Sequence, residues 1–560
     1  MARTNLPKPN STTCWRISAR FAAVEGGSMK VQFGRIIVLG VLIGISVWCG
    51  LAAGQISPQQ LVDGLKNPSR WLTYSGDYNG QRYSPLTQLT PSNAQQLTVQ
   101  WAFQTGVLGR FEAVPVVIDG IVYVTGPANR AWAIDARTGR RIWSYQHEVP
   151  EKPGTSVNRG FAVLGNKLYM TTLDSHLVAL DMKTGNVVWE SVMDDYKRGY
   201  YATMAPLVVK NEVIVGIGGA DEGTRGFIDS FDAETGKRNW RFWTVPEPGS
   251  PGSETWTGNA WEHGGGSTWL TGTYDPELNL IYWGTGNPAP DLLGSVRAGD
   301  NLYTASVVAL DADTGKLRWH YQFTPHDTHD WDAVQIPVLA DINAGGARRK
   351  VLMLANRNGF FYTLDRTNGK LMVAKPFVQT TWAKEIGADG RPVELPNNTP
   401  TDQGTVTCPD VIGGTNWNSP AFNPATGLFY VTARETCATY YAWQQDFIED
   451  RDFFGGTGRN TGRGSGAVRA IDPLTGQIKW ESKQFTPSMS GLLTTASGLL
   501  FGGDADGNVT AYDARTGRIV WNFQTGSAVY AAPVTVMVGT KQLVLAGSGT
   551  TIFAFGLPAN

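Results

Sequence analysis

The chain has 560 residues and a formal net charge of −1, and 42% of its residues are hydrophobic while 17% are charged. This hydrophobic content is enough for a large packed core and excludes a disordered chain. The near-zero charge argues against a nucleic-acid-binding protein, which normally has a basic face. The 66 Gly and 20 Trp residues favour a turn-rich all-β protein over a helical one.

The first 54 residues differ in composition from the rest of the chain. They contain six basic residues and one acid, and the segment 36–53 is apolar and uncharged. This pattern predicts an export signal over residues 1–54 that is cleaved near Gln55, with Met29 as an alternative start. An uncleaved membrane anchor is the other interpretation, because the apolar segment is just long enough to span a bilayer. Both interpretations place the folded domain in the periplasm.

The phrase Asp-x-x-Thr-Gly-x-x-x-Trp recurs along the chain. Six full copies end at Trp143, Trp189, Trp240, Trp319, Trp480 and Trp521. A seventh, from Asp365, has Val373 in place of Trp, and a weaker eighth ends at Trp101. Asp, Thr and Gly form a tight hairpin turn, and a Trp repeated once per unit can wedge between neighbouring sheets. The repeat predicts an all-β fold, a single eight-bladed β-propeller over residues 55–560.

Two parts of the chain are longer than the repeat requires. Trp240 and Trp319 are 79 residues apart, whereas the preceding intervals are 42, 46 and 51 residues. Long insertions are therefore expected in residues 244–300 and 376–470. Inserts of this length in a compact domain usually carry function.

The cysteines separate into two pairs. Cys14 and Cys49 belong to the leader, which leaves Cys408 and Cys437 in the folded domain. A lone pair in an exported protein is most simply a disulfide. The sequence has no Cys-x-x-Cys-His motif, so no covalently attached c-type haem is expected.

Single-copy segments point to a family. They are Phe-Glu-Ala-Val-Pro at 111–115, Asn-Arg-Gly at 158–160, Gly-Gly-Gly-Ser-Thr-Trp at 264–269, Gly-Thr-Gly-Asn-Pro-Ala-Pro at 284–290, Thr-Pro-His-Asp at 324–327 and Asn-Arg-Asn-Gly at 356–359. With them the chain resembles, from about Trp71 to Phe555, the pyrroloquinoline-quinone (PQQ) dependent alcohol dehydrogenases of the methanol dehydrogenase large-subunit type. A propeller of another family would share the Trp repeat but not these segments.

The resemblance implies a metal ion that acts as a Lewis acid on the quinone. Hard cations prefer oxygen ligands, and the family's amide ligand matches Asn287. Its acidic ligand, normally Glu, matches Asp221, which is one methylene shorter. Glu222 is the alternative by one register.

The family's catalytic base, which also lies at the metal, matches Asp330. Two residues on, Asp332 matches an extra ligand of the lanthanide-dependent members, whereas calcium members tend to have a small residue there. One more negative oxygen favours a trivalent over a divalent ion by Coulomb attraction. The resemblance therefore implies one Ca²⁺ or lanthanide ion, with the lanthanide favoured.

The resemblance also implies a pocket for PQQ, a flat tricarboxylate. Trp269 matches the stacking floor and Arg159 matches a carboxylate clamp, a role that suits the guanidinium fork. Arg357 matches a catalytic and cofactor-binding residue over the quinone oxygens, where positive charge stabilises the reduced form. The remaining polar contacts match Glu112, Thr203, Gly219 and Asn416. In the same family the structural disulfide matches Cys408 and Cys437.

Further departures from the family pattern surround this pocket. The family often carries adjacent cysteines above PQQ, where this chain has Pro153 and Gly154. A Trp expected before Ser490 is Met489, which offers less area to a ring. Together with the shortened Asp221, these changes leave open a propeller that has lost catalysis.

The sequence predicts an exported dehydrogenase that oxidises primary alcohols to aldehydes by hydride transfer to PQQ, with Asp330 as the base. The electron acceptor is expected to be a soluble c-type cytochrome. A sugar or polyol dehydrogenase and a non-catalytic propeller scaffold are the alternatives. The joint presence of Asp330, Asp332, Asn287 and Arg357 argues against the scaffold, since folding alone does not need them. A homodimer is left open, and no nucleic-acid partner is expected.

Overall fold

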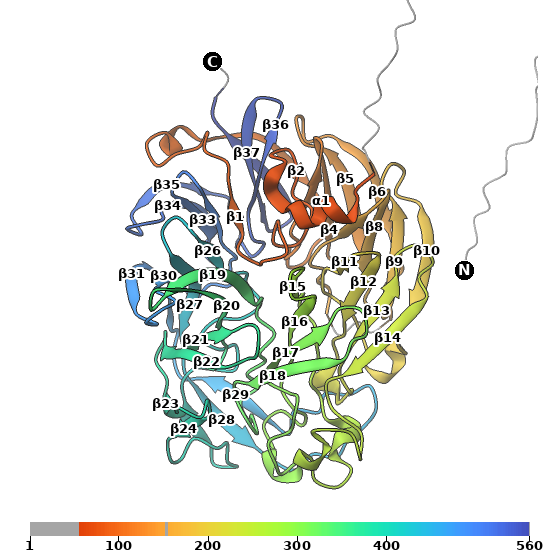
Figure 1. Ribbon diagram of the computed structural model, residues 1–560, viewed down its shortest axis with the longest axis vertical. Helices are drawn as coiled ribbons and strands as arrows, with labels where there is room; N and C mark the ends of the chain where they lie inside the picture. The colour runs from red at the N-terminus through yellow and green to blue at the C-terminus, as the bar shows by residue number, and fades with distance from the viewer. Residues whose placement is uncertain (1–54, 152–154, 559–560) are drawn as a thin grey trace, which may run out of the picture. The chain divides into compact units, whose positions relative to one another are not determined.

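The computed structural model describes residues 55–151 and 155–558. The predicted export signal lies outside the described residues. The described chain consists almost entirely of β-strands, arranged as successive antiparallel sheets around a ring (Figure 1). Within the described ranges, no helix is long and apolar enough to cross a membrane.

Eight four-stranded units make up the ring within the described residues. The first four are β3 (Val116–Ile118), β4 (Ile121–Gly126), β5 (Arg130–Asp135) and β6 (Arg141–Gln146); β7 (Ala162–Leu164), β8 (Lys167–Thr171), β9 (His176–Asp181) and β10 (Val187–Val192); β11 (Leu207–Val209), β12 (Glu212–Gly216), β13 (Phe227–Asp232) and β14 (Arg238–Trp243); β15 (Thr273–Asp275), β16 (Leu280–Gly284), β17 (Ser306–Asp311) and β18 (Leu317–Gln322).

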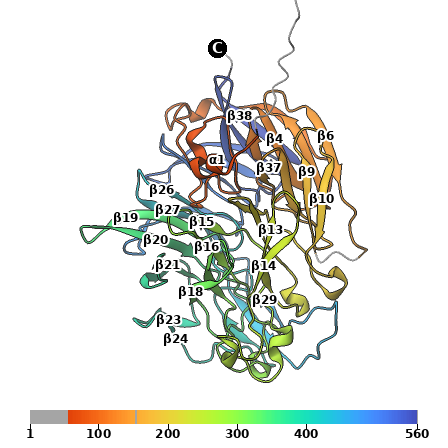
Figure 2. The same ribbon diagram turned by 45° about the vertical axis from the view of Figure 1, so that its right-hand side comes forward.

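The other four units follow in chain order, and the last of them borrows a strand from the beginning of the chain. They are β19 (Val338–Ala344), β20 (Ala347–Ala355), β21 (Phe360–Asp365) and β22 (Leu371–Pro376); β26 (Ala421–Asn423), β27 (Leu428–Glu435), β30 (Ser465–Ile471) and β31 (Ile478–Gln484); β32 (Leu493–Thr495), β33 (Leu499–Gly503), β34 (Asn508–Asp513) and β35 (Ile519–Gln524); β36 (Val534–Val538), β37 (Lys541–Ser548), β38 (Thr551–Gly556) and β2 (Thr98–Gln104). The hairpin of β19 and β20 projects beyond its neighbours (Figure 2).

Short elements fill the connections. The helix α1 (Pro58–Asp63) precedes the ring, and β1 (Tyr83–Ser84) adds a parallel strand to β32. The connections between β22 and β26 and between β27 and β30 hold β23 (Ala383–Ile386), β24 (Pro392–Glu394), β25 (Thr405–Thr407), β28 (Ala438–Ala442) and β29 (Gly456–Asn460). Single 3₁₀ turns span Gly64–Lys66, Ala94–Gln96, Tyr196–Arg198, Ala220–Glu222, Ser253–Thr255, Ala260–His263 and Gly294–Val296. The expected disulfide joins Cys408, just after β25, to Cys437, just before β28.

The repeated Trp docks each blade on the next. The turn after β9 holds Gly185 at φ 74°, and a Cβ there would lie 2.7 Å from the Trp143 ring of the preceding blade. Trp143 Nε1 also donates to the Met182 carbonyl at 3.0 Å. The same ring-on-glycine contact recurs for Trp101 on Gly139, Trp189 on Gly236, Trp240 on Gly315, Trp319 on Gly369 and Trp480 on Gly517. Gly is required at these turns for both its positive φ and its missing side chain.

Where the Trp is absent, the blade contact changes but the blade remains. Val373 lies on Gly476 of the next blade together with the Lys375 side chain. The ring closes between the last two blades, where Trp521 Nε1 donates to the Leu97 carbonyl at 3.2 Å. The antiparallel pairing of β2 with β38 joins the two ends of the domain. The predicted eight-bladed propeller is therefore confirmed.

The innermost strands position the functional loops. The first strands of the blades from β3 to β32 are buried, apart from the projecting end of β19, whereas β6 at the outer edge is largely exposed. The loops that enter the first strands and those that join second to third strands lie at one end of the ring, because the strands are antiparallel.

Replacing Gly185 by Ala tests the docking contact. We expect a loss of about 1–2 kcal/mol from the positive φ and a further loss of about 1–3 kcal/mol from collision with the Trp143 ring. Chemical denaturation measures the sum of the two losses as a change in the free energy of unfolding. The matched control is Gly427→Ala, since Gly427 has φ 71° and nothing within 4 Å of an added Cβ. Equal losses in the two variants would contradict the docking role.

Candidate active site

A cavity of about 450 Å³ opens at the end of the ring where the inner-strand loops gather. Residues from most blades line it, although they are far apart in the sequence. Of the residues predicted for the site, it brings together Glu112, Arg159, Thr203, Gly219, Asp221, Trp269, Asp330, Asp332, Arg357 and Asn416. Met489 also lines it, whereas Pro153 and Gly154 lie outside the described residues.

One wall of the cavity combines a cation with aromatic rings. The Arg159 guanidinium lies 4.8 Å from the Trp269 ring centroid and 5.6 Å from that of Trp417. Arg159 is 5% exposed and pairs with Glu112 at 2.8 Å, and it donates to Thr203 Oγ1 at 2.5 Å. Its Nε has no hydrogen-bond partner among the described residues. Rings and a cation with a spare donor suit a flat, anionic ligand.

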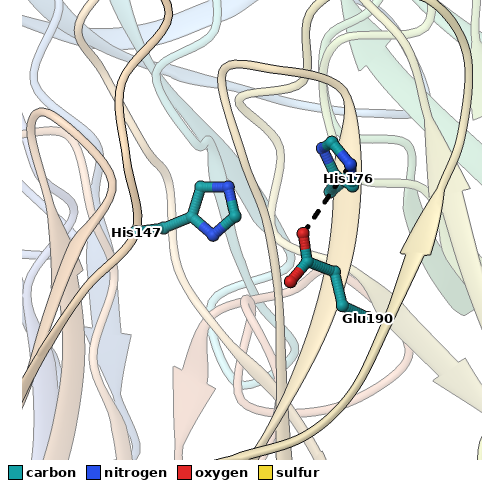
Figure 3. Close-up of side chains that lie close together, drawn as sticks. All are labelled: His147, His176 and Glu190. Atoms are coloured by element: carbon teal, nitrogen blue, oxygen red, sulfur yellow. Dashed lines mark ion pairs between the residues drawn. The ribbon is translucent and has the colours of Figure 1, made fainter.

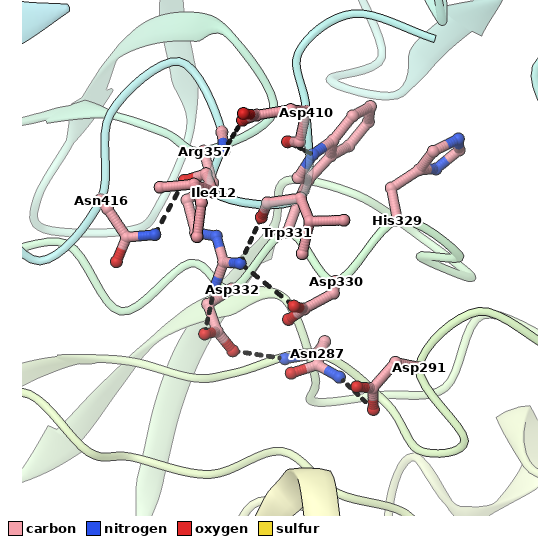
Figure 4. Close-up of polar contacts among 12 residues, drawn as sticks. Asn287, Asp291, His329, Asp330, Trp331, Asp332, Arg357, Asp410, Ile412 and Asn416 are labelled. Carbon is pink, nitrogen blue, oxygen red and sulfur yellow. Dashed lines mark hydrogen bonds and ion pairs between the residues drawn. The ribbon is translucent and has the colours of Figure 1, made fainter. Parts of the chain in front are cut away.

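The loop before β19 directs two acids into the cavity. Asp327 accepts hydrogen bonds from the backbone N–H groups of His329 at 3.2 Å and Trp331 at 2.8 Å. The rings of His329 and Trp331 stack with centroids 4.3 Å apart and pack into the wall. Asp330, at φ 60°, and Asp332 face the other way and line the cavity (Figure 4). Asp is among the few residues that adopt this left-handed conformation without severe strain.

Arg357 connects these two acids. Its guanidinium lies 3.3 Å from Asp330 Oδ2 and also pairs with Asp332 (Figure 4). Asp332 further accepts hydrogen bonds from Trp269 Nε1 at 3.0 Å and from the Asn287 backbone N–H at 2.9 Å. Burial alone would lower the pKa of Arg357, but the charges of Asp330 and Asp332 outweigh it and raise that pKa. Arg357 is therefore a fixed positive charge in the cavity.

Close packing at Gly286 brings Asn287 to the same acids. A Cβ on Gly286 would collide with the Asp332 carboxylate, so only glycine lets the backbone approach this closely. Asn287 is 1% exposed, and within the described residues its Oδ1 has no hydrogen-bond partner. A buried amide oxygen without a partner is costly, and a bound cation would satisfy it.

Three carboxylates gather near the Asn287 side chain, whose Nδ2 donates to one of them, Asp291, at 2.8 Å. Asp221, Asp291 and Asp330 offer oxygens that all lie within 4.8 Å of one another. Burial, and then the nearby charge of Asp332, raises the pKa of Asp221 to about 6. Burial and neighbouring carboxylates likewise raise the pKa values of Asp291 and Asp330 well above their usual range. A hard cation would stabilise the ionised forms, and oxygen ligands are the type it prefers.

Asp221 and Glu222, the two candidates for the acidic metal ligand, face different pockets. Asp221 lines the main cavity, while Glu222 lines a separate small pocket with Asp450 and Asp452. Burial, followed by the charge of Asp221, raises the pKa of Glu222 to about 8. The placement favours Asp221 over Glu222 as the acid that belongs to the site.

Sequence reasoning missed Asp291 and Trp417. Asp291 directly follows the Gly-Asn-Pro-Ala-Pro segment that drew attention to Asn287, four residues earlier. The only local signal was its position four residues after the predicted metal ligand Asn287. Trp417 follows the predicted Asn416 and lies near Arg159 on the side of Trp269.

Comparisons with known proteins identify the family of this chain. A family model described as "Glucose/ethanol/alcohol dehydrogenase, beta-propeller domain" matches residues 71–376, and one described as "Outer membrane protein assembly factor BamB" matches residues 464–555. The chain is 42% identical over 510 residues to the quinohemoprotein alcohol dehydrogenase ADH IIB of Pseudomonas putida, covering 86% of this chain and 73% of that protein. This chain belongs to the PQQ-dependent alcohol dehydrogenase family.

Other members extend the likeness. The 1-butanol dehydrogenase (cytochrome c) of Thauera butanivorans is 37% identical, over 85% of this chain and 73% of that protein. The structure of a europium-containing methanol dehydrogenase superposes with a TM-score of 0.85 at 32% identity, covering 89% of this chain and all of that one. The protein is thus a quinoprotein alcohol dehydrogenase.

A second cluster of metal-binding residue types lies away from the cavity. His147, His176 and Glu190 come together where β9 and β10 meet the end of β6 (Figure 3). Asp174 Oδ2 lies 2.9 Å from His147 Nε2 and 3.0 Å from His176 Nδ1, and His176 Nε2 lies 3.6 Å from Glu190. The hydrogen bond to Asp174 raises the pKa of His176 above 6.5. The cluster is therefore a charged hydrogen-bond network between two blades.

Replacing Asp174 by Asn tests that network. Because the folded-state pKa of His176 is raised, its stabilisation is complete below the ordinary pKa and is lost as the pH rises through the folded value. The variant should therefore lower the melting temperature more at about pH 5.5 than at about pH 9. Glu190→Gln is the control and should change it less. A loss independent of pH would contradict the role of the His176 charge.

Proposed function

We propose that the protein is an exported enzyme that oxidises primary alcohols to aldehydes with PQQ and one metal ion. The observation that supports it most is a division of charge within one cavity. Arg159 and the rings of Trp269 and Trp417 form one wall, whereas Asp221 and Asp330 form another. The buried Asn287, whose backbone N–H contacts Asp332, has an amide oxygen without a partner among the described residues. An anionic aromatic cofactor fits the first wall and a hard cation fits the second.

PQQ, when bound, accepts the hydride of the alcohol, and the metal ion polarises the quinone as a Lewis acid. Arg159 would bind a carboxylate of the cofactor, with Glu112 and Thr203 fixing the guanidinium. The Trp269 ring would stack on the cofactor, and its Nε1 donates to Asp332 at 3.0 Å. Gly219 and Asn416 would complete the polar contacts.

Asp330 would act as the base. Its left-handed backbone aims the carboxylate into the cavity, and Arg357 lies 3.3 Å from it. Together with a bound cation, Arg357 would keep the carboxylate ionised, so that Asp330 can accept the hydroxyl proton of the alcohol. The positive charge of Arg357 would also stabilise negative charge that develops in the cavity.

The metal ion would be held by Asp221, Asn287 and Asp330. Asp332 is a predicted ligand as well, although its oxygens accept hydrogen bonds from Trp269, Arg357 and Asn287. Within the described residues, Oδ1 accepts only the Asn287 N–H, so it keeps a lone pair with which Asp332 could bind the ion. A lanthanide or Ca²⁺ suits such an oxygen-rich set.

The electrons would leave the enzyme through a soluble c-type cytochrome in the periplasm. The absence of a Cys-x-x-Cys-His motif and the acceptor in the name of the Thauera relative support this partner. The basic and apolar composition of residues 1–54 supports export.

The test is an absorbance spectrum and a dye-linked assay of the purified protein with PQQ, supplied with Ca²⁺ in one sample and La³⁺ in another. We expect quinone absorbance and ethanol-dependent dye reduction, greater with La³⁺. Absence of bound quinone under both metals would overturn the proposal and leave the scaffold interpretation.

Asp330→Asn tests the base. An amide cannot accept the proton, so kcat should fall by about 10²–10⁴-fold, while the melting temperature and quinone absorbance stay close to those of the parent. The control is Asp300→Asn, since Asp300 lies on the surface and pairs with Arg391. Near-normal kcat in Asp330→Asn would rule out its role as the base.

A further inference from the structure

Asp291 is a buried acid beside the site that the mechanism above does not use. It is 1% exposed, and it follows Asn287 on the loop between β16 and β17. Asn287 Nδ2 donates to Asp291 Oδ1 at 2.8 Å (Figure 4). In the described part of the chain, the other oxygen, Oδ2, has no hydrogen-bond partner.

The hydrogen bond fixes the Asn287 and Asp291 side chains relative to each other. Because Asn287 uses its amino group on Asp291, its carbonyl oxygen Oδ1 is left for another partner. The Asp291 carboxylate lies within ligand spacing of those of Asp221 and Asp330, all within 4.8 Å. Asp291 therefore joins two further carboxylates, and both it and its hydrogen-bonded neighbour Asn287 keep an oxygen without a partner among the described residues.

Among the described residues, no ion pair joins the Asp291 carboxylate to Arg297, the cation whose charge acts on it. Arg297 is fully buried, but it donates to the carbonyl oxygens of Pro290, Asp291 and Asp327 and to the Asn301 side chain. Its donors are therefore directed at the backbone and an amide, not at the Asp291 carboxylate. A buried carboxylate without a cationic partner is strongly disfavoured, and a metal ion would provide the missing positive charge.

Asp332 differs from Asp291 in this respect. Both Asp332 oxygens accept hydrogen bonds, from the Asn287 N–H on one side and from Trp269 and Arg357 on the other. Asp332 therefore already has partners that fix the cofactor wall, whereas Asp291 faces the carboxylate cluster.

We propose that Asp291 binds the metal ion directly, as a carboxylate ligand beside Asp221, Asn287 and Asp330. This inference rests on the proposed function, since it concerns the same metal ion. Asp291 adds a negative charge where Asp221 is a short ligand, and attraction to an ion grows with the charge of that ion. Asp291 therefore favours a trivalent over a divalent cation at this site.

The experiment measures Eu³⁺ bound to the full chain, with and without PQQ. Luminescence lifetimes in H₂O and D₂O give the number of water molecules on the ion, and titration gives the affinity. For Asp291→Asn we expect one or more additional waters and an affinity loss of at least about 10–100-fold, since even the loss of a residue behind a ligand costs that much. Competition with Ca²⁺ should show a smaller loss for Ca²⁺.

Two matched variants separate ligation from charge. Glu222→Gln removes a nearby buried acid that faces the other pocket, and it should leave the hydration number unchanged. Asp332→Asn tests the competing ligand. The inference is overturned if Asp291→Asn binds Eu³⁺ with the hydration and affinity of the parent, or if Glu222→Gln matches its effects. Should Asp291→Asn fail to fold, the Eu³⁺ excitation energy of the parent protein decides, because it shifts with the number of carboxylates on the ion.

The two proposals fail in different ways. If the parent protein oxidises alcohol with PQQ but Asp291→Asn binds Eu³⁺ unchanged, only the ligand role of Asp291 is contradicted. Eu³⁺ held through Asp291 in a protein that neither binds PQQ nor oxidises alcohol supports the ligand role and overturns the proposed function.

Discussion

The contact of a Trp ring with the glycine of the next blade is the interaction on which the domain depends. No blade can bury both faces alone, so each is stabilised by its neighbours. Trp521 on the Leu97 carbonyl and the pairing of β2 with β38 complete the ring. Because the ring is closed, the loops that enter the inner strands are held at fixed positions around one axis. Side chains from Glu112 to Met489 can therefore line a single cavity.

The cavity concentrates charges that a folded chain would otherwise avoid. Arg159 and Glu112 are buried as a pair, and Arg357 is buried between two acids. Asp221 and Asp291 gather with Asp330, with carboxylate oxygens within 4.8 Å of one another, and burial raises the pKa values of both. Buried like charges are destabilising unless a counter-ion is bound. This costly arrangement is consistent with the proposed site, in which a cation and an anionic ring would bind side by side.

Much of this could be predicted because the decisive signals are local. The Asp-x-x-Thr-Gly turn and the following Trp lie within nine residues, and Asp365 marks its blade even where Val373 replaces the Trp. The residues assigned from resemblance lie in short single-copy segments, and the fold brings nearly all of them to one cavity. Asp291 was not predicted as a site residue because it lies just beyond the recognised segment, and because its neighbours Asp221 and Asp330 are distant in the sequence.

The blades, their number, the two cysteines that pair and the family could be predicted from the amino-acid sequence, because each is encoded in short segments of the chain. Which acids lie together depends on how loops from different blades meet, so that grouping emerges only in the folded molecule. The tertiary structure separated Asp221 from Glu222, turned Asp332 toward Arg357 and Trp269, and brought Asp291 to the Asn287 amide. Neighbouring residues on an irregular loop can face opposite directions, and periodicity does not specify which one faces the site.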